Sequence, residues 1–149
     1  MVYFLDTNVF LRILVREDEK SFRECKDLLE KVKKLEIEAV TAGIVLTEAG
    51  WTLGSYYKIS RAAVAEKLEG IVGLGGLKIV DRYDWGRVFK FYGELNVKLV
   101  DAVIAAMPEV FKKEWTVVSY DEDFRKLPVK WVKPGEIRKL GKKAPSDAS

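Results

Sequence analysis

Short apolar runs that favour β-strands alternate with helical patterns along the chain, and this alternation limits the possible fold more than any other feature. The runs lie at residues 2–5, 38–41, 77–80, 116–119 and 129–132. Between them, apolar residues recur at helical spacing, as in Phe22, Cys25, Leu29 and Val32. Strands that alternate with helices form a mainly parallel sheet covered by helices. The 149 residues therefore predict an α/β fold in one domain.

Four acidic residues stand inside apolar stretches of this pattern, where Asp and Glu are rare unless their charge is compensated. They are Asp6 in VYFLDTNVFLR, Glu48 in GIVLTEAGW, Asp101 in VKLVDAVIAAM and Asp121 in TVVSYDEDF. Asp6 and Asp121 come just after predicted strands, whereas the other two lie in early turns of predicted helices. Because ligands bind at the carboxyl ends of the strands in open parallel sheets, we expect all four acids to face one cleft.

Each acid taken alone also has a purely structural interpretation. Asp6 and Asp121 are suited to cap a helix or close a turn after a strand. Asp101 is placed to complement the dipole of its helix, and Glu48 to point into solvent. Asp123, in the segment DEDF, is a fifth candidate with an equal claim to a capping role. The four acids together, in this order of strands and helices, favour a shared site.

The composition excludes most other kinds of catalytic and metal site. The chain has no histidine and a single cysteine, Cys25. Imidazole catalysis, His- or Cys-built zinc sites and an internal disulfide are therefore excluded. We expect Cys25 to be a small buried hydrophobic residue. Carboxylates without imidazole or thiolate partners indicate a hard divalent cation, Mg²⁺ or Mn²⁺.

Basic residues gather near the end of the chain although the net charge is only +3. Between residues 125 and 143, eight Lys or Arg stand against one acid, Glu136. This segment is either a solvated end that keeps the protein soluble or a surface that faces phosphates. No apolar run reaches the roughly 18–20 residues that span a bilayer, and the N-terminus lacks the basic region of a signal peptide. We therefore expect a cytoplasmic protein with no membrane partner.

These motifs together resemble the PIN-domain ribonuclease family, in particular the toxins of VapBC-type toxin–antitoxin pairs. FLDTNVFLR is similar to the family's opening strand followed by Asp-Thr-Asn, and LTEAGW to its helical segment with a Glu. VDAVIAA is similar to the central Asp-Ala helix, and VSYDEDF to the closing Thr/Ser-x-Asp-x-Asp-Phe. The matched segments extend from Phe4 to Phe124. Ser119 stands where Thr is common and Pro108 is unusual, but no acid is missing.

The resemblance implies a three-layer α/β/α sandwich with a mainly parallel sheet of about five strands. The nuclease domain would cover residues 1–140, and residues 141–149 are expected to form a flexible tail. The implied activity is divalent-metal-dependent hydrolysis of phosphodiester bonds in RNA. Two alternatives remain open: a housekeeping RNA-processing nuclease, or a PIN-like module that binds RNA or a partner without cutting. A response-regulator receiver is disfavoured because Thr7, not a second acid, follows Asp6.

The resemblance also assigns roles to individual residues. The expected catalytic set is Asp6, Glu48, Asp101 and Asp121. Of these, the three aspartates are the expected ligands of Mg²⁺ or Mn²⁺, and the glutamate is expected to bind through water or orient the nucleophile. The residues expected to support the set by hydrogen bonds are Asn8, Ser119 and Asp123. The candidate contacts to the RNA backbone are Lys139, Lys142 and Lys143.

A homodimer and a small antitoxin protein are the partners that the resemblance implies. Apolar residues that one small domain cannot easily bury agree with an interface. They are Phe10, Leu11, Ile13 and Leu14 after the first acid, and Trp51, Tyr56 and Tyr57 near the second predicted helix. Trp51 follows Glu48 by about one helical turn, so we expect it to pack beneath that acid.

Overall fold

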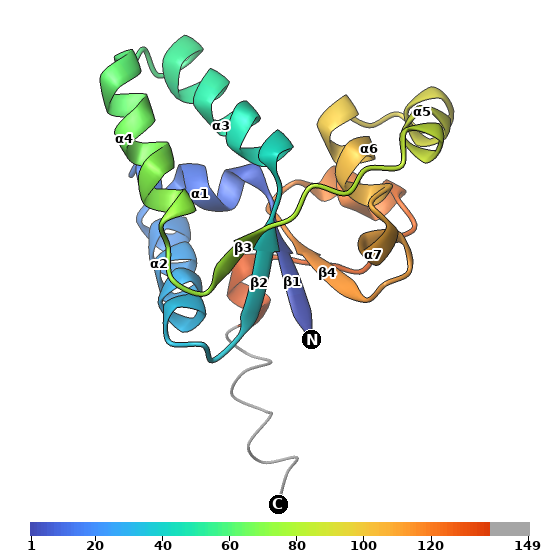
Figure 1. Cartoon of the computed structure of the whole chain (residues 1–149), viewed down its shortest axis with the longest axis horizontal. Coiled ribbons are helices and arrows are strands. Elements are labelled where there is room, and N and C mark those ends of the chain that lie inside the picture. The colour runs from blue at the N-terminus through green and yellow to red at the C-terminus, as the bar shows by residue number, and fades with distance from the viewer. Residues whose placement is uncertain (138–149) are drawn as a thin grey trace, which may run out of the picture.

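In the computed structural model, which describes residues 1–137, five strands form one sheet (Figure 1). The strands are β1 (Val2–Leu5), β2 (Glu38–Thr41), β3 (Leu77–Ile79), β4 (Trp115–Val118) and β5 (Trp131–Val132). Their order across the sheet is β3-β2-β1-β4-β5, and every adjacent pair is parallel. The predicted parallel sheet of five strands is confirmed.

Helices flank the sheet, as the α/β prediction requires. They are α1 (Thr7–Leu14), α2 (Glu19–Lys33), α3 (Gly43–Ser55), α4 (Arg61–Val72), α5 (Trp85–Glu94), α6 (Leu99–Ala105), α7 (Pro108–Phe111) and a 3₁₀-helix, η1 (Glu122–Lys126). Figure 1 shows α1 to α4 gathered on one side of the sheet and α5 to α7 on the other. Among the described residues, no helix is long and apolar enough to cross a membrane.

The strand order creates a switch point beside β1. From β1 the chain moves outward through β2 to β3, and it then returns to the other side of β1 to add β4 and β5. Helices that follow β1 and β4 therefore leave the sheet in different directions, and a crevice opens between them at the carboxyl ends of these two strands. Asp6 and Asp121 follow these two strands in the sequence.

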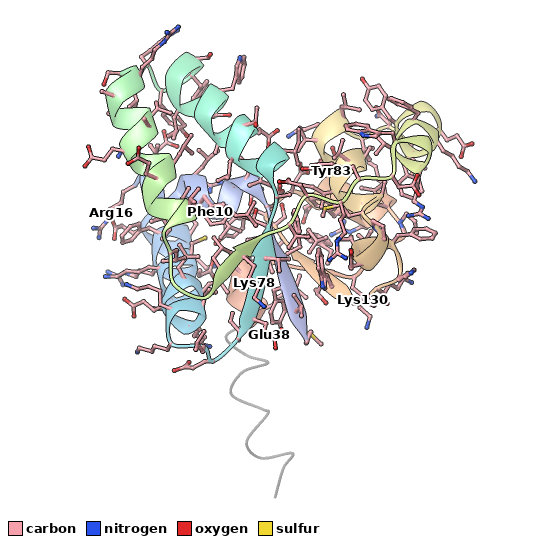
Figure 2. All side chains as sticks on the ribbon, viewed as in Figure 1. Phe10, Arg16, Glu38, Lys78, Tyr83 and Lys130 are labelled. Carbon is pink, nitrogen blue, oxygen red and sulfur yellow. The ribbon has the colours of Figure 1, made fainter. Side chains whose placement is uncertain are left out.

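Helix α1 is the main element that the sequence patterns did not predict. The apolar residues after Asp6 predict an exposed surface that agrees with an interface. This segment is instead a helix of eight residues whose Val9 and Phe10 are buried. Figure 2 shows Phe10 inside the molecule, whereas Arg16, just beyond the end of α1, reaches outward. The expectation that Phe10 contributes exposed apolar surface was wrong, because α1 packs on both α2 and α3.

Other predicted elements are present with small shifts at their ends. Asp18, Ser60 and Asp84 cap α2, α4 and α5 by accepting backbone hydrogen bonds. Pro108 does not merely follow α6 but occupies the first position of α7, where its missing N–H costs nothing. Cys25 is completely buried, and burial raises the pKa of its thiol to about 11, in agreement with a packing role.

Residues 138–149 lie outside the described residues. The expected flexible tail at residues 141–149, the domain boundary at residue 140 and the three candidate RNA contacts therefore stay predictions. These contacts are Lys139, Lys142 and Lys143.

Candidate active site

Asp6 stands at the carboxyl end of β1 and begins α1. Its backbone N–H donates to the Val118 carbonyl of β4 at 3.0 Å, so the sheet continues to this residue. Its carboxylate caps α1 by accepting a hydrogen bond from the Thr7 N–H at Oδ1, at 2.7 Å. The Ser119 hydroxyl donates to Oδ2 at 2.6 Å. The residue is only 3% exposed, and its predicted capping role is confirmed.

Ser119 and Asn8 fix the segment after β4 against α1. The Ser119 hydroxyl, which is completely buried, accepts from the Asn8 side-chain amide at 2.9 Å and from the Asp121 N–H at 3.0 Å. The Asn8 side-chain oxygen accepts from the Tyr120 N–H at 3.1 Å. The two residues therefore hold Asp6 and Asp121 in a fixed relation to each other.

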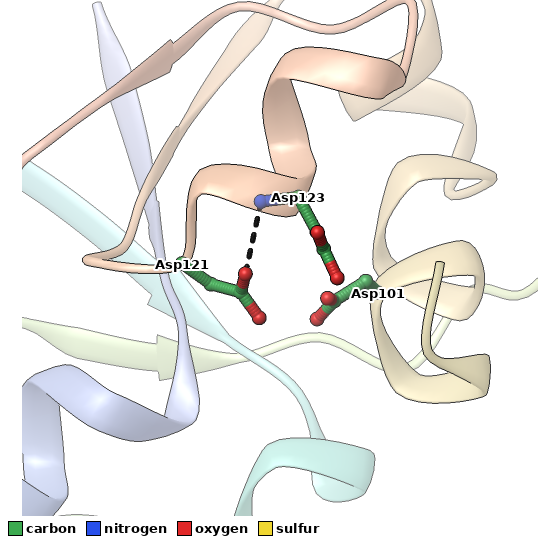
Figure 3. Close-up of side chains that lie close together, drawn as sticks. All are labelled: Asp101, Asp121 and Asp123. Carbon is green, nitrogen blue, oxygen red and sulfur yellow. Dashed lines mark hydrogen bonds between the residues drawn. The ribbon is translucent and has the colours of Figure 1, made fainter. Parts of the chain in front are cut away.

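Asp101, Asp121 and Asp123 converge on one point from two helices (Figure 3). Asp121 caps η1 by accepting from the Asp123 N–H at 2.9 Å, and Asp101 projects from the first turn of α6. One carboxylate oxygen from each of the three lies within 4.8 Å of the others. Asp101 is 4% exposed, and its Oδ2 is buried without a hydrogen-bond partner. Capping falls to Asp121 rather than to Asp123, which pairs with Lys126 at 3.2 Å.

Glu48 approaches the same place from α3. No side chain of the N-cap residue, Ala42, bonds the start of this helix. The Asp81 carboxylate accepts from the Gly43 N–H at 2.6 Å instead, and the Tyr83 hydroxyl accepts from the Ile44 N–H at 3.3 Å. The connection after β3 thereby anchors the helix that carries Glu48.

One small hollow of about 180 Å³ brings the four predicted acids together. Its charged lining in the described residues consists of Asp6, Glu48, Asp101, Asp121 and Lys98. Lys98, which the sequence patterns did not single out, pairs with Asp121 at 3.3 Å. Its position three residues before Asp101 is the only sequence signal that could have drawn attention to it.

A comparison of the sequence with models of protein families shows which family the chain belongs to. The PIN domain family model matches residues 3–130, which is most of the chain. The chain belongs to the PIN domain family. Proteins of this family are nucleases. A comparison with curated proteins finds no match.

Solved structures share the fold of this PIN domain. One is VapBC2 from Rickettsia felis, bound to a DNA fragment from its promoter. It has 20% identity and a TM-score of 0.63, and the match covers 89% of this chain and 98% of that chain. PAE2754 from Pyrobaculum aerophilum has 14% identity and a TM-score of 0.63, and the match covers 98% of this chain and 96% of that chain. VapBC-1 from nontypeable Haemophilus influenzae has 16% identity and a TM-score of 0.59, and the match covers 90% of this chain and 98% of that chain. At these identities the likeness establishes the fold alone.

The pKa values of the acids in this PIN domain are shifted in different directions. Burial raises the pKa of Asp6 to about 6, although the hydrogen bonds from Ser119 and Thr7 oppose the rise. Burial and the negative charges of Asp6 and Asp121 raise the pKa of Asp101 to about 8. Burial also acts against ionisation of Asp121, but the hydrogen bonds from the Asp123 N–H and the Asp101 carboxyl, together with Lys98, lower its pKa overall. Without an added cation, Asp101 therefore keeps its proton at neutral pH.

The residues of the hollow fit a hard divalent cation. Carboxylate oxygens are the ligands that Mg²⁺ and Mn²⁺ prefer. The unpartnered, buried Oδ2 of Asp101 is the kind of atom that a native protein rarely leaves without a partner. A bound divalent ion would satisfy this oxygen and allow Asp101 to ionise beside Asp6 and Asp121. The cluster of Asp101, Asp121 and Asp123 would hold the ion, and Asp6 lines the same hollow.

Trp51 does not lie where the sequence patterns placed it. Its side chain is 70% exposed instead of packed beneath Glu48, so that expectation was wrong. The buried face of α3 is formed by Val45, Ala49 and Leu53, which recur every four residues. At about 100° per residue, Trp51 falls on the opposite side of the helix from this face.

Proposed function

We propose that this PIN domain protein is a divalent-metal-dependent endoribonuclease and the toxin of a toxin–antitoxin pair. The observation that carries the proposal is the buried carboxylate of Asp101, whose Oδ2 lacks a partner in a hollow that also holds Asp6, Glu48 and Asp121. A fold has little reason to bury so many acids together unless a cation compensates them. Membership of a nuclease family connects that cation to phosphodiester hydrolysis.

The proposal gives each acid of the hollow a role. The chemistry that bound Mg²⁺ or Mn²⁺ supplies is activation of water and stabilisation of negative charge on the phosphate. Asp6, Asp101 and Asp121 would hold the ion. Ser119, to which Asn8 donates, donates in turn to Asp6 and accepts from the Asp121 N–H, so it keeps these two aspartates in place. Glu48 enters from α3, a different element, and its proposed role is to orient the attacking water and accept its proton. In-line attack of this water forms one P–O bond and breaks the bond to the leaving ribose oxygen.

RNA is the proposed substrate, and the test measures its cleavage directly. A labelled single-stranded RNA of mixed sequence is incubated with the purified chain and Mn²⁺ or Mg²⁺. We expect cleavage that stops in excess EDTA and in Asp101→Asn. A single-stranded DNA of the same sequence shows whether the 2′-hydroxyl matters. RNA cleavage that continues at the full rate in excess EDTA, or in an Asp6→Asn, Asp101→Asn double variant, would contradict the proposed mechanism.

An antitoxin is the proposed protein partner. Two of the solved structures that share the fold are VapBC complexes, and this supports a pair of the same kind here. A small protein encoded beside this chain should co-purify with it and inhibit RNA cleavage. If no short gene neighbours this one and no small protein co-purifies, the housekeeping RNA-processing alternative is the better interpretation.

A homodimer is proposed from the exposed aromatic residues on the two sides of the hollow. Trp51 on α3 is 70% exposed, and Trp85 and Phe89 on α5 are 51% and 63% exposed. Helix α3 contributes Glu48 to the hollow, and α5 packs on α6, which contributes Asp101. Exposed apolar patches of this kind mark interfaces. Light scattering over a concentration series tests the proposal, and a monomer at tens of micromolar would contradict it.

A further inference from the structure

Lys98 is the one cation that lines the acidic hollow within the described part of the chain. Its ammonium lies 3.3 Å from Oδ2 of Asp121. The Lys98 side chain is 69% exposed, whereas that of Asp121 is 19% exposed. The pair thus joins a fixed acid to a long side chain with free space around it.

The backbone of Lys98 is held firmly although its side chain is not. Its carbonyl accepts the Ala102 N–H at 3.1 Å and begins α6, and the preceding residue, Val97, is buried. The position therefore fixes where the side chain starts, at the rim of the hollow. The flexible stem of a lysine lets the ammonium reach more than one partner from that start.

Lysine is an unfavourable residue at the start of a helix. Lys98 is the N-cap of α6, where Ser, Thr, Asp or Asn would satisfy the free N–H groups of the first turn, and no side-chain cap is present. A positive charge also opposes the positive end of the helix dipole. Where a residue breaks the local rules, the reason often lies in function. The ion pair with Asp121 offsets the local cost, and it connects this residue to the site.

The charges in the hollow define what Lys98 can do. Its ammonium is within the electrostatic reach of Asp121, Asp101 and Glu48. One ammonium cannot neutralise this set of carboxylates, but it lowers the repulsion among them. A divalent cation that binds Asp121 competes with the ammonium for the same carboxylate, because two positive charges at one carboxylate repel each other. The displaced ammonium then lies beside the cleft that would receive a phosphodiester.

We propose that Lys98 is a two-position cation that pairs with Asp121 in the metal-free site and contacts the phosphate of RNA when a divalent ion is bound. This inference rests on the proposed function. In the first position the ammonium holds the acids together and weakens metal binding. In the second, its hydrogen bonds to a non-bridging phosphate oxygen help to hold the substrate and stabilise the charge that develops during hydrolysis.

The test compares Lys98→Ala and Lys98→Arg with a matched control, Lys126→Ala. Lys126 pairs with Asp123 of the same cluster at 3.2 Å but does not line the hollow. Titration of Mn²⁺ into each EDTA-stripped and desalted protein measures metal affinity without RNA. We expect Lys98→Ala to bind Mn²⁺ about two- to fivefold more tightly than the wild type, the factor expected for loss of one exposed ion pair. The control should change the affinity less.

RNA binding and cleavage test the second position. Binding of a single-stranded RNA in Ca²⁺ should weaken in Lys98→Ala, and its log–log salt slope should fall by about 0.7, one phosphate contact. At saturating Mn²⁺ we expect the cleavage rate of Lys98→Ala to fall by roughly tenfold or more, with partial recovery in Lys98→Arg.

Two results would overturn the inference. One is a Mn²⁺ affinity for Lys98→Ala that equals or falls below that of the wild type. The other is RNA binding and cleavage at wild-type levels in the same variant. If the wild-type chain itself cleaved no RNA, the proposed function would fail, yet the Mn²⁺ titration would still decide whether Lys98 competes with the ion.

Discussion

Two hollows at the sheet differ in what they bury. The hollow at the carboxyl ends of β1 and β4 measures about 180 Å³ and contains Asp6 and Asp101, both nearly inaccessible to solvent. The hollow along β2 and β3 is larger, at about 650 Å³. Its charged lining includes Glu38 and Lys78, which are exposed and lie near the lower end of the sheet in Figure 2.

The difference shows that size is a poor guide to the site of this protein. An exposed Glu or Lys stays hydrated whether or not a ligand is bound, so a ligand gains little free energy by pairing with it. The buried Asp101 carboxylate has lost its hydration and has one oxygen without a partner, so a cation gains much by binding there. We therefore propose the smaller hollow, rather than the larger one, as the site of the reaction.

The largest expected effect comes from removing a carboxylate of the small hollow. Asp101→Asn should lower the rate of RNA cleavage by more than about 100-fold, since even residues that only support metal ligands cost about 10- to 100-fold. The matched control is Glu38→Gln in the larger hollow, for which we expect a wild-type rate. A cleavage assay at saturating Mn²⁺ measures both. Equal losses in the two variants would show that the comparison between the hollows is wrong.

The next effect is a dependence of metal-free stability on pH. The pKa values of Asp6 and Asp101 in the folded protein, about 6 and about 8, lie above the ordinary value of 3.8. The folded state thus binds protons that the unfolded state has released. The contribution of these two groups to stability is fully present below about pH 3.8 and is lost as pH rises through their folded-state pKa values. Thermal melting in EDTA should show a falling transition temperature from about pH 5 to pH 8.

Two further measurements sharpen this pH prediction. Asp101→Asn should flatten the decrease between pH 6 and pH 8, because the residue with the higher pKa no longer ionises. Saturating Mn²⁺ should restore the stability of the wild type at pH 8, because the ion compensates the charges. A metal-free stability that increases over this range would contradict the assigned electrostatics of the hollow.

A smaller effect is expected for the hydroxyl that supports Asp6. Ser119→Ala removes the donor to Asp6 and the acceptor for Asn8 and the Asp121 N–H. We expect a decrease of about 1–3 kcal/mol in the free energy of unfolding and of about 10- to 100-fold in activity. Ser119→Thr, which keeps the hydroxyl, is the control and should retain most activity. Denaturant unfolding and a cleavage assay provide the two values.

The smallest effect is expected in the larger hollow. Lys78 is exposed on β3, and Lys78→Ala should change the free energy of unfolding by less than about 0.5 kcal/mol and leave cleavage unchanged. Denaturant unfolding measures the first value. A loss of activity in this variant would show that the larger hollow contributes to the reaction.

Local patterns were enough to predict the strands and most helices. Residues 2–5 and 38–41 are strands with the predicted bounds, and the helical spacing of Phe22, Cys25, Leu29 and Val32 lies in α2. Apolar periodicity and capping preferences act over a few residues, so they can be interpreted without knowledge of the fold. These local patterns did not predict helix α1, because its apolar residues are adjacent in the sequence rather than spaced along one helical face. The burial of α1 depends on its contacts with α2 and α3.

The sequence by itself determined the order of the elements and the positions of the four acids at strand ends and in early helical turns. Only the tertiary structure decided how these acids differ. Burial depth and neighbouring charges, which depend on residues far apart in the chain, raise the pKa of Asp101 and lower that of Asp121. The same long-range packing brought Lys98 to Asp121 and left Trp51 in solvent. A local pattern cannot contain this information, because electrostatic energy depends on distances between atoms and on burial, not on separation along the chain.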